Sequence, residues 1–296
     1  MSKLLNVSAI LCSAILCLLV YFANTWAQNG ASQIRHVRVL ETDDYFDAAN
    51  LNGVVFPPRA NSVLVLDQPI PDAGTIILVP PGRLPGDPEA LSQVISDPIN
   101  ITFDSRANRL FLFERNSNEL VAIYLRGGLL NPNAIQRFKA DEFGVVDPSG
   151  IAVDPKTGTL FILDRFGPKI VQVDPGPDRK NYEGAAALEE GRISKFFLQQ
   201  SQGRLRGLGF NHADGCLYAF SPTRQELYKI TEDSELVSVG DFSGFDRIDP
   251  KGFVFAPSLD QTDDAGRMNL YIASSGGPSG QVSEWSLTPC VQGSAQ

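Results

Sequence analysis

Acidic residues recur at two kinds of position in this 296-residue chain, and carboxylates that gather in space can bind a divalent cation or a polar ligand. In the first kind the acid directly precedes proline, as in Asp97, Asp147 and Asp249. In the second kind the acid ends a short hydrophobic segment, as in Asp67, Glu114 and Asp164. A structural role is the alternative, because aspartate before proline commonly fixes a turn by accepting hydrogen bonds from backbone N–H groups.

One asparagine and several arginines extend this set. Asn100 occupies a position at which the corresponding segments of the chain have glycine, and its amide can bind a ligand or make a local turn bond. Together with Glu114 and Asp164 it forms the candidate ligand set for a metal ion, with Ca²⁺ as the candidate cofactor. The candidate ligand-binding residues are Asn100, Glu114, Asp147, Asp164, Arg165, Arg204 and Asp249.

Other chemistries find little support in the sequence, and no catalytic residue is predicted. The chain has only two histidines, His36 and His212, and no Gly-x-Ser-x-Gly segment for a nucleophilic serine. The net charge of −9, without a cluster of lysine and arginine, argues against nucleic-acid binding. The segment Asp260–Gly266 has three carboxylates, but their spacing does not match a calcium loop, which favours a solvated loop.

A repeat of 45 to 57 residues places the candidate residues in space. Its five copies are Asn52–Asp67, Pro98–Glu114, Pro148–Asp164, Arg206–Ser221 and Lys251–Ser274. The aligned anchor positions are Gly53, Asn100, Gly150, Gly207 and Gly252. A period of this length, in a chain rich in glycine and proline and poor in helical patterns, predicts an all-β propeller built from four-stranded blades.

The strand count favours five blades. Each copy supplies two strands, a third follows, and a fourth precedes the next anchor; the predicted fourth strands are Ser92–Ser96, Ile135–Lys139, Ile193–Leu198 and Leu236–Val239. The fifth unit lacks its fourth strand, and the isolated N-terminal strand His36–Thr42 can fill that gap and close the ring. Six blades are the alternative if the insert Pro175–Gly191, interpreted as a loop with a short helical segment, contains a degenerate unit.

This fold brings the two kinds of acidic residue together. The loop that enters the first strand of a blade and the loop that follows its second strand lie on the same rim of a propeller. We therefore expect an acidic rim around the central channel, with arginines interspersed among the carboxylates. The recurrent aromatic residues of the strands are expected to pack between blades.

The N-terminus reads as a targeting segment. Residues 1–27 combine Lys3, the apolar run Leu4–Ala23 and small residues at the ends of Thr25-Trp26-Ala27, which predicts a signal peptide cleaved after Ala27. An uncleaved membrane anchor is the alternative. A disordered linker (28–35), one propeller domain (36–290) and a tail (291–296) would follow, in the periplasm or outside the cell. In such an oxidising compartment the two remaining cysteines, Cys216 and Cys290, can form a disulfide or stay separate thiols.

The third copy resembles the NHL-type propeller repeat. The residues that carry the resemblance are Pro148, Gly150–Asp154, Gly158, Leu160–Ile162, Asp164 and Lys169-Ile170. The chain looks like exported bacterial propellers with this repeat, most of which have no assigned activity. The resemblance is specific for fold and not for function. A binding or interaction module, whose partner is a protein or a small polar ligand, is favoured because the sequence shows no catalytic constellation and the fold offers flat rims and a channel to partners. A hydrolase or lactonase similar to gluconolactonase-type propellers, with a divalent cation at the channel mouth, is the alternative.

Overall fold

The fold is that of a computed structural model, which describes most of the chain between Ile34 and Leu287. The described residues are 34–40, 51–57, 63–70, 73–79, 95, 97–126, 129–177, 182, 184–199, 204–246, 248–259, 263–264, 266–275 and 280–287. They belong to one compact unit, Ile34–Leu287. The predicted signal peptide, most of the predicted linker, the tail 291–296 and Cys290 lie outside the described residues.

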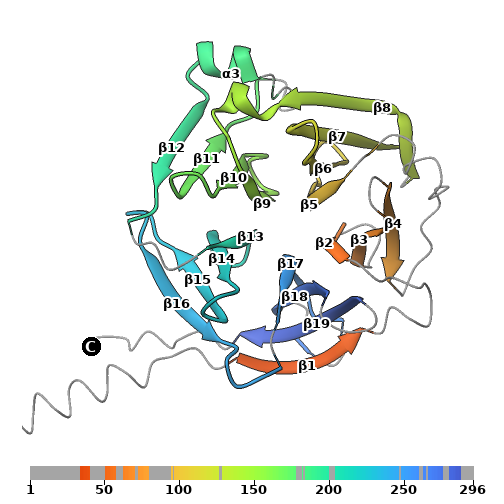
Figure 1. Cartoon of the computed structure of the whole chain (residues 1–296), viewed down its shortest axis with the longest axis vertical. Helices are drawn as coiled ribbons and strands as arrows, with labels where there is room; N and C mark the ends of the chain where they lie inside the picture. Colours follow the sequence, from red (N-terminus) through yellow and green to blue (C-terminus); the bar gives the residue numbers. More distant parts are fainter. Residues whose placement is uncertain are drawn as a thin grey trace, which may run out of the picture. The chain divides into compact units, whose positions relative to one another are not determined.

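Within the described residues the strands form five antiparallel sheets arranged around a common centre (Figure 1). The first sheet has three strands: β2 (Leu51–Val55), β3 (Val63–Ile70) and β4 (Ala73–Val79). The second has β5 (Pro98–Asp104), β6 (Arg109–Glu114), β7 (Glu119–Arg126) and β8 (Leu129–Lys139). The third has β9 (Pro148–Val153), β10 (Leu160–Asp164), β11 (Lys169–Val173) and β12 (Ile193–Phe197).

The fourth sheet has β13 (Arg206–Asn211), β14 (Cys216–Ser221), β15 (Glu226–Ile230) and β16 (Leu236–Asp241). The fifth has β17 (Pro250–Pro257), β18 (Met268–Ser275), β19 (Gly280–Leu287) and, at its outer edge, β1 (Ile34–Leu40). The predicted propeller is therefore confirmed. The predicted fourth strand of the first blade, Ser92–Ser96, lies almost entirely outside the described residues, and no sixth sheet forms within them.

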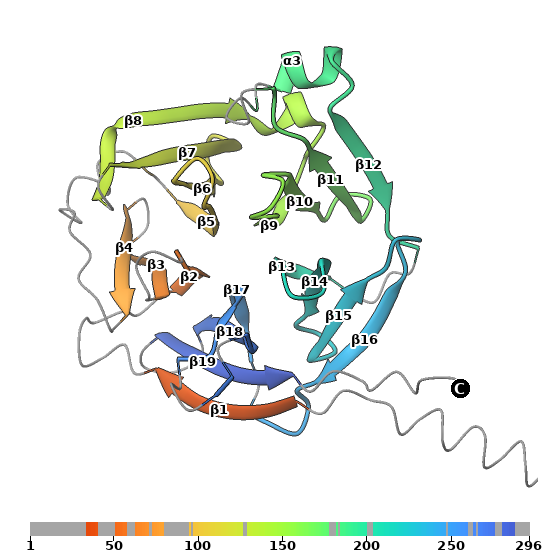
Figure 2. The ribbon, with the colours of Figure 1, turned by 180° about the vertical axis from the view of Figure 1, so that it is seen from behind.

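The inner strands make a continuous ring. Contacts join β2 to β5, β5 to β9, β9 to β13, β13 to β17 and β17 back to β2. Seen from either side, these five strands lie nearest the centre, and the outermost strands are β4, β8, β12, β16 and β1 (Figures 1 and 2). The channel is therefore lined by the first strand of every repeat.

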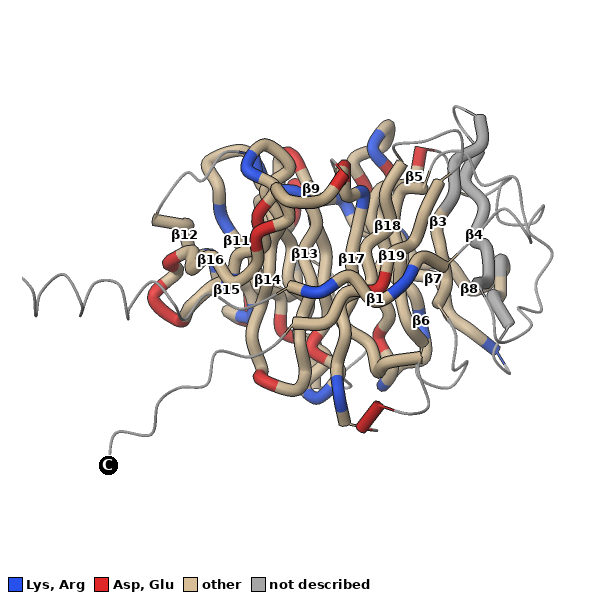
Figure 3. The backbone as a smooth tube through the Cα atoms, turned by 90° about the horizontal axis from the view of Figure 1, so that it is seen from below, with Lys and Arg blue, Asp and Glu red and all other residues tan. Residues whose placement is uncertain are grey.

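The N-terminal strand closes the ring as predicted. β1 pairs antiparallel with β19 and runs beside it in the side view of Figure 3. The strand starts two residues earlier than predicted, because Ile34 pairs with Leu287 and packs against the aromatic core of blades 4 and 5. Arg38 donates to the fully buried carboxylate of Glu284 at 2.6 Å, so an ion pair joins the first strand to the last. Closure leaves β19 without a free edge.

The hydrophobic core lies between neighbouring blades. Phe111 and Phe113 of blade 2, for example, pack with Ile151 and Ile162 of blade 3. The aromatic residues that recur along the strands serve this packing as expected, and Tyr271 is fully buried. Each blade therefore buries one face against the next.

The anchor glycines form a narrow waist where the inner strands meet. A Cβ atom on Gly150 would lie 2.6 Å from the backbone N of Leu208, and one on Gly252 would lie 3.0 Å from Cα of Gly53. Glycine is required at these points because the backbone of the next blade occupies the space of a side chain. The repeated glycine that identified the fold in the sequence thus marks the closest approach of the blades.

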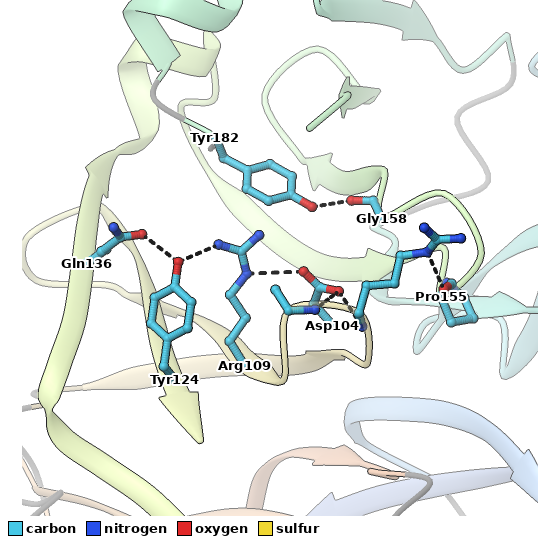
Figure 4. Close-up of polar contacts among 9 residues, drawn as sticks. Asp104, Arg109, Tyr124, Gln136, Pro155, Gly158 and Tyr182 are labelled. Carbon is cyan, nitrogen blue, oxygen red and sulfur yellow. Dashed lines mark hydrogen bonds and ion pairs between the residues drawn. The ribbon is translucent and has the colours of Figure 1, made fainter. Parts of the chain in front are cut away.

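The insert between β11 and β12 folds over the outer side of blades 2 and 3. It carries the short helix α3 (Gly184–Glu189), which contacts the 3-10 turn η1 (Ala140–Phe143). Tyr182 is fully buried, and its hydroxyl donates to the carbonyl oxygen of Gly158. Figure 4 shows its ring above the guanidinium of Arg109, which is itself buried and bonded to Asp104 at 3.1 Å. The insert therefore stabilises the blade 2–3 contact.

None of the helices in the described residues is both long and apolar enough to cross a membrane.

Candidate functional site

A bulge opens every inner strand at one end of the channel. The register with the second strand shifts between Leu51 and Gly53, Ile99 and Ile101, Pro148 and Gly150, Arg206 and Leu208, and Pro250 and Gly252. Two residues there oppose one partner, which bends the strand and redirects a side chain. The extra residues of the five bulges are Asn52, Asn100, Ser149, Gly207 and Lys251, and the four that have side chains line one channel mouth.

A polar cavity of about 410 Å³ lies at this mouth. Its walls are Asn52, Ile99, Asn100, Arg115, Asn118, Val146, Asp147, Pro148, Ser149, Arg165, Arg206 and Lys251. All five blades contribute to this set. Four of the residues are cationic and one is anionic, and the further carboxylates Asp97 and Asp249 adjoin the cations as ion-pair partners, so the expected acidic rim is a mixed rim of cations and carboxylates. We call this space the polar chamber.

Asn100 reaches the polar chamber from a strained backbone position. Its φ is 53°, in the left-handed region, and its side chain is 7% exposed. Asparagine tolerates that conformation better than any other residue except glycine. The conformation explains why Gly207, with φ 73°, occupies the equivalent place in blade 4. Asn100 therefore keeps the local geometry of glycine and adds an amide to the chamber.

The cationic groups of the polar chamber are held by ion pairs with neighbouring aspartates. Arg165 lies 2.7 Å from Asp147 within blade 3. Arg206 of blade 4 lies 2.7 Å from Asp249 of blade 5. That carboxylate also contacts Lys251 at 2.9 Å. Side chains that are already paired lose less freedom when they bind a ligand, so the chamber is partly pre-organised.

Arg115 has a looser arrangement. Its guanidinium lies 3.5 Å from Asp97, and its side chain is 62% exposed. The pair is equivalent to Arg165–Asp147 in the next blade. In both pairs the backbone N–H of the arginine also donates to the backbone carbonyl oxygen of the aspartate. The expectation that an aspartate before proline accepts backbone N–H groups with its carboxylate was wrong for Asp147, whose carboxylate accepts from the Arg165 guanidinium while its main-chain carbonyl oxygen accepts the backbone N–H of Arg165.

Asp164 does not line the chamber. Its carboxylate is fully buried and accepts N–H groups from Val146 at 2.9 Å, Asp147 at 3.0 Å and Phe166 at 2.9 Å. Lys169 Nζ donates to it at 2.6 Å. Burial by itself would raise the pKa of Asp164, but the Lys169 ammonium and the three N–H groups outweigh it and hold that pKa below its usual range. The residue clamps the loop that carries Asp147.

Glu114, the equivalent residue of blade 2, is also directed away from the chamber. It is bound by the guanidinium of Arg137 on the outer strand β8 and accepts the hydroxyl of Ser117 at 3.1 Å. The hydrogen bond with Glu114 raises the pKa of Arg137 despite the partial burial of that guanidinium. Arg204 is exposed in the segment before β13 and does not line the chamber either.

The structure therefore brings together part of the predicted site. Asn100, Asp147 and Arg165 line the polar chamber, and Asp249 adjoins it through Arg206. The three proposed metal ligands, Asn100, Glu114 and Asp164, do not line one cavity, and the described residues contain no group of three His, Cys, Asp or Glu side chains suited to a metal. Cys216 is half-buried, while Cys290 lies outside the described residues, so their pairing stays a prediction.

Sequence reasoning did not select four further polar wall residues: Asn52, Asn118, Ser149 and Lys251. Asn52, Ser149 and Lys251 are the extra residues of their bulges, the place that Asn100 holds in blade 2 and Gly207 in blade 4. The sequence alignment of Asn100 with Gly53, Gly150 and Gly252 was therefore wrong by one residue. The position before the repeated glycine was the available signal for these three residues, because the bulge at that point directs the side chain into the mouth. His212 lies at the opposite end of the channel, away from this site.

No protein-family model matches the chain, and no curated protein sequence matches it either. Solved structures do resemble it. A chain of a nidogen/laminin complex shares 16% identity over 82% of this chain and 83% of that chain, with a TM-score of 0.50. Glutaminyl cyclase of Myxococcus xanthus shares 12% identity over 86% of this chain and 97% of that chain, with a TM-score of 0.55. The chain is a β-propeller. Identities this low show the fold alone.

Proposed function

We propose that the protein is a binding propeller of the NHL-repeat type that captures a small polar ligand with an anionic group in the polar chamber. The observation that carries the proposal is the wall of that chamber, where Arg115, Arg165, Arg206 and Lys251 come from four different blades and Asp147 is the single acid. Cations gathered from separate blades around one concave space are suited to a carboxylate, sulfate or phosphate group.

The amides supply the rest of the recognition. Asn52, Asn100 and Asn118 offer both donors and acceptors, and Ser149 offers a hydroxyl. A ligand that carries hydroxyl groups beside its charge, such as a sugar acid, would satisfy both parts of the wall. Hydrogen bonds to charged groups contribute about 1.5–3 kcal/mol each, so several must act together to offset the cost of association.

Two further parts of the proposal rest on the sequence. The NHL type is supported by the third repeat and by the structural role of its anchor glycine, Gly150. Export to the periplasm or the cell exterior is supported by the composition of residues 1–27. Cell fractionation followed by N-terminal sequencing of the protein in each fraction would locate the cleavage site. A protein that keeps Met1 and is found in the membrane fraction would favour the anchor.

Titration calorimetry with D-glucuronate and D-glucose tests the binding proposal, because the two sugars differ in the carboxylate. We expect glucuronate to bind and glucose to bind far more weakly. The variant Arg206→Gln should weaken glucuronate binding about tenfold. The matched variant Arg204→Gln removes an exposed arginine outside the chamber and should leave binding unchanged. Equal heats for the two sugars, or equal losses in the two variants, would overturn the proposal.

A cation-dependent hydrolase or lactonase remains the second candidate. It is favoured by the position of Asn100 in the chamber, but it requires Glu114 and Asp164 to leave Arg137 and Lys169. Melting curves with EDTA and with added Ca²⁺ decide the matter, since a metal that binds only the folded protein raises its melting temperature. An unchanged melting temperature would remove this candidate and leave the binding proposal standing.

A further inference from the structure

A second cavity occupies the opposite end of the channel. It has a volume of about 310 Å³ and is walled by the same five inner strands, beyond the glycine waist. Its residues are Val55, Phe56, Ile101, Thr102, Phe103, Ser105, Ile151, Ala152, Val153, Pro155, Leu208, Gly209, Phe210, His212, Phe253, Val254, Phe255 and Pro257. We call it the apolar chamber.

The chemistry of the apolar chamber is opposite to that of the polar chamber. Only Thr102, Ser105 and His212 among its wall residues carry polar side chains, and the wall contains no Lys, Arg, Asp or Glu. The rest of the wall is aliphatic, aromatic, proline or glycine, with phenylalanines from four blades. Several wall side chains are almost entirely inaccessible, such as Ile151 at 2% and Phe253 at 4%. Water in such a space has few hydrogen-bond partners.

The order of residues along each strand shows where the chamber opens. Ser105 and Pro155 lie in the turns after β5 and β9, His212 lies in the turn after β13, and Pro257 ends β17. These turns form the rim opposite the polar mouth. Ser105 and His212, which are two of the three polar residues, are therefore at the entrance, and the apolar walls lie deeper toward the waist.

We propose that the apolar chamber binds a small, uncharged aromatic or hydrocarbon molecule whose body lies among the phenylalanines and whose polar group, if it has one, faces His212 and Ser105. The volume supports this class of ligand. An apolar protein cavity of roughly 150 Å³ binds benzene, so about twice that volume accommodates a two-ring molecule. The walls are strands rather than loops, so the chamber is formed before a ligand arrives.

The packing of the wall also favours flat rings. Phe255 meets Tyr218 with ring centroids 4.7 Å apart, and it meets Phe253 edge to face at 6.3 Å. In the neighbouring blade, Phe210 stacks on Phe161 at 6.0 Å with an angle of 5° between the rings. These contacts hold the rings of the wall in place, so they offer fixed faces and edges to an aromatic ligand.

Fluorescence titration of the purified protein with naphthalene and 2-naphthol tests the inference. We expect saturable binding of both, with 2-naphthol favoured by its hydroxyl. Val254→Phe should fill the chamber from blade 5 and weaken naphthalene binding about tenfold. The matched variant Val237→Phe makes the same exchange on the outer strand β16, where Val237 is 46% exposed, and should bind as the original protein does.

A second filling variant keeps the test decisive if Val254→Phe fails to fold. Thr102→Leu enlarges a half-buried wall residue of blade 2 and should weaken naphthalene binding in the same way. Arg206→Gln, which alters the polar chamber, should leave it unchanged, so this site and the proposed anion site fail or succeed separately. The absence of saturable binding, or binding that survives in both filling variants, would overturn the inference.

Discussion

Lys169 Nζ lies 2.6 Å from Oδ2 of Asp164 at the base of the channel mouth, and the carboxylate is fully buried. The same carboxylate accepts the backbone N–H groups of Val146, Asp147 and Phe166. One buried acid thus fixes the loop that enters blade 3 and the turn that follows its second strand. The position of Arg165 and Asp147 in the polar chamber depends on this clamp.

Removing the charge of Asp164 should be costly. Asp164→Asn leaves Lys169 buried without its counter-charge, and breaking a buried pair in this way costs about 3–5 kcal/mol. Urea denaturation would measure the loss. The matched variant Asp154→Asn alters a more exposed turn carboxylate, which bonds to Lys156 N–H and Thr157, and should cost far less. Equal losses in the two variants would show that Asp164 is no clamp.

The same pair predicts a dependence of stability on pH. The pKa of Asp164 is lowered in the folded protein, so its contribution is fully present above the pKa of the unfolded chain, which is about 3.9. It is lost as the pH falls below that value and through the folded pKa. The unfolding free energy of Asp164→Asn should therefore change less than that of the original protein between neutral and acidic pH. Parallel pH profiles would contradict this assignment.

Asn100 allows backbone strain and ligand binding to be separated. Asn100→Gly keeps a residue that accepts φ near 53° and removes the amide, so stability should hold while glucuronate binding weakens. Asn100→Ala forces a Cβ residue with no polar side chain into the left-handed region and should also cost about 1–2 kcal/mol of stability. Calorimetric titration and denaturation of the two variants give both quantities. Unchanged binding in Asn100→Gly would exclude the amide from recognition.

The glycine waist should be intolerant of a single methyl group. Gly150→Ala places Cβ against the backbone of Gly207 and Leu208, and overpacking of this kind costs about 1–3 kcal/mol or more. Gly244→Ala is the matched control, because a Cβ there has no neighbour within 4 Å and the backbone is not in the left-handed region. If both variants unfold at the same denaturant concentration, the waist is not a close backbone contact.

Ring closure depends on Arg38. Arg38→Met removes the guanidinium from the buried carboxylate of Glu284. Because Asn269 still donates to that carboxylate at 2.7 Å, we expect the free energy of unfolding to fall by roughly 3 kcal/mol. Arg35→Met alters an exposed residue of the same strand and should have little effect. Thermal melting and light scattering would report the loss of stability and the association of an exposed β19 edge. Identical behaviour of the two variants would mean that this ion pair does not hold the ring closed.

The fold was predictable because its determinants are local and repeated. Asp154, Pro155 and Gly158 specify a turn within a few residues, and the alternation of apolar residues on both sides specifies the strands. The anchor glycine returns in most repeats, which gave the number of blades. The first blade was harder, since Pro57-Pro58 replaces the usual turn and its fourth strand lies outside the described residues.

The site was only partly predictable because its contacts cross strands. Nothing near Glu114 in the sequence indicates Arg137, which lies 23 residues away on the outer strand. Asp164 resembled a rim ligand until its four bonding partners were visible. The polar residues before the anchors were overlooked because a bulge, which the sequence does not display, decides where Ser149 and Lys251 point.

The side-chain amide resonances of Asn100 provide the most direct test of the central claim that an anionic ligand binds in the polar chamber. In ¹⁵N–¹H spectra recorded during titration with D-glucuronate, we predict saturable shifts of the Asn100 amide and of the Nε–H groups of Arg165 and Arg206. The Nε–H of Arg204 should stay in place, and D-glucose should cause far smaller changes. Saturable shifts confined to residues outside the chamber, or none at Asn100, would contradict the account.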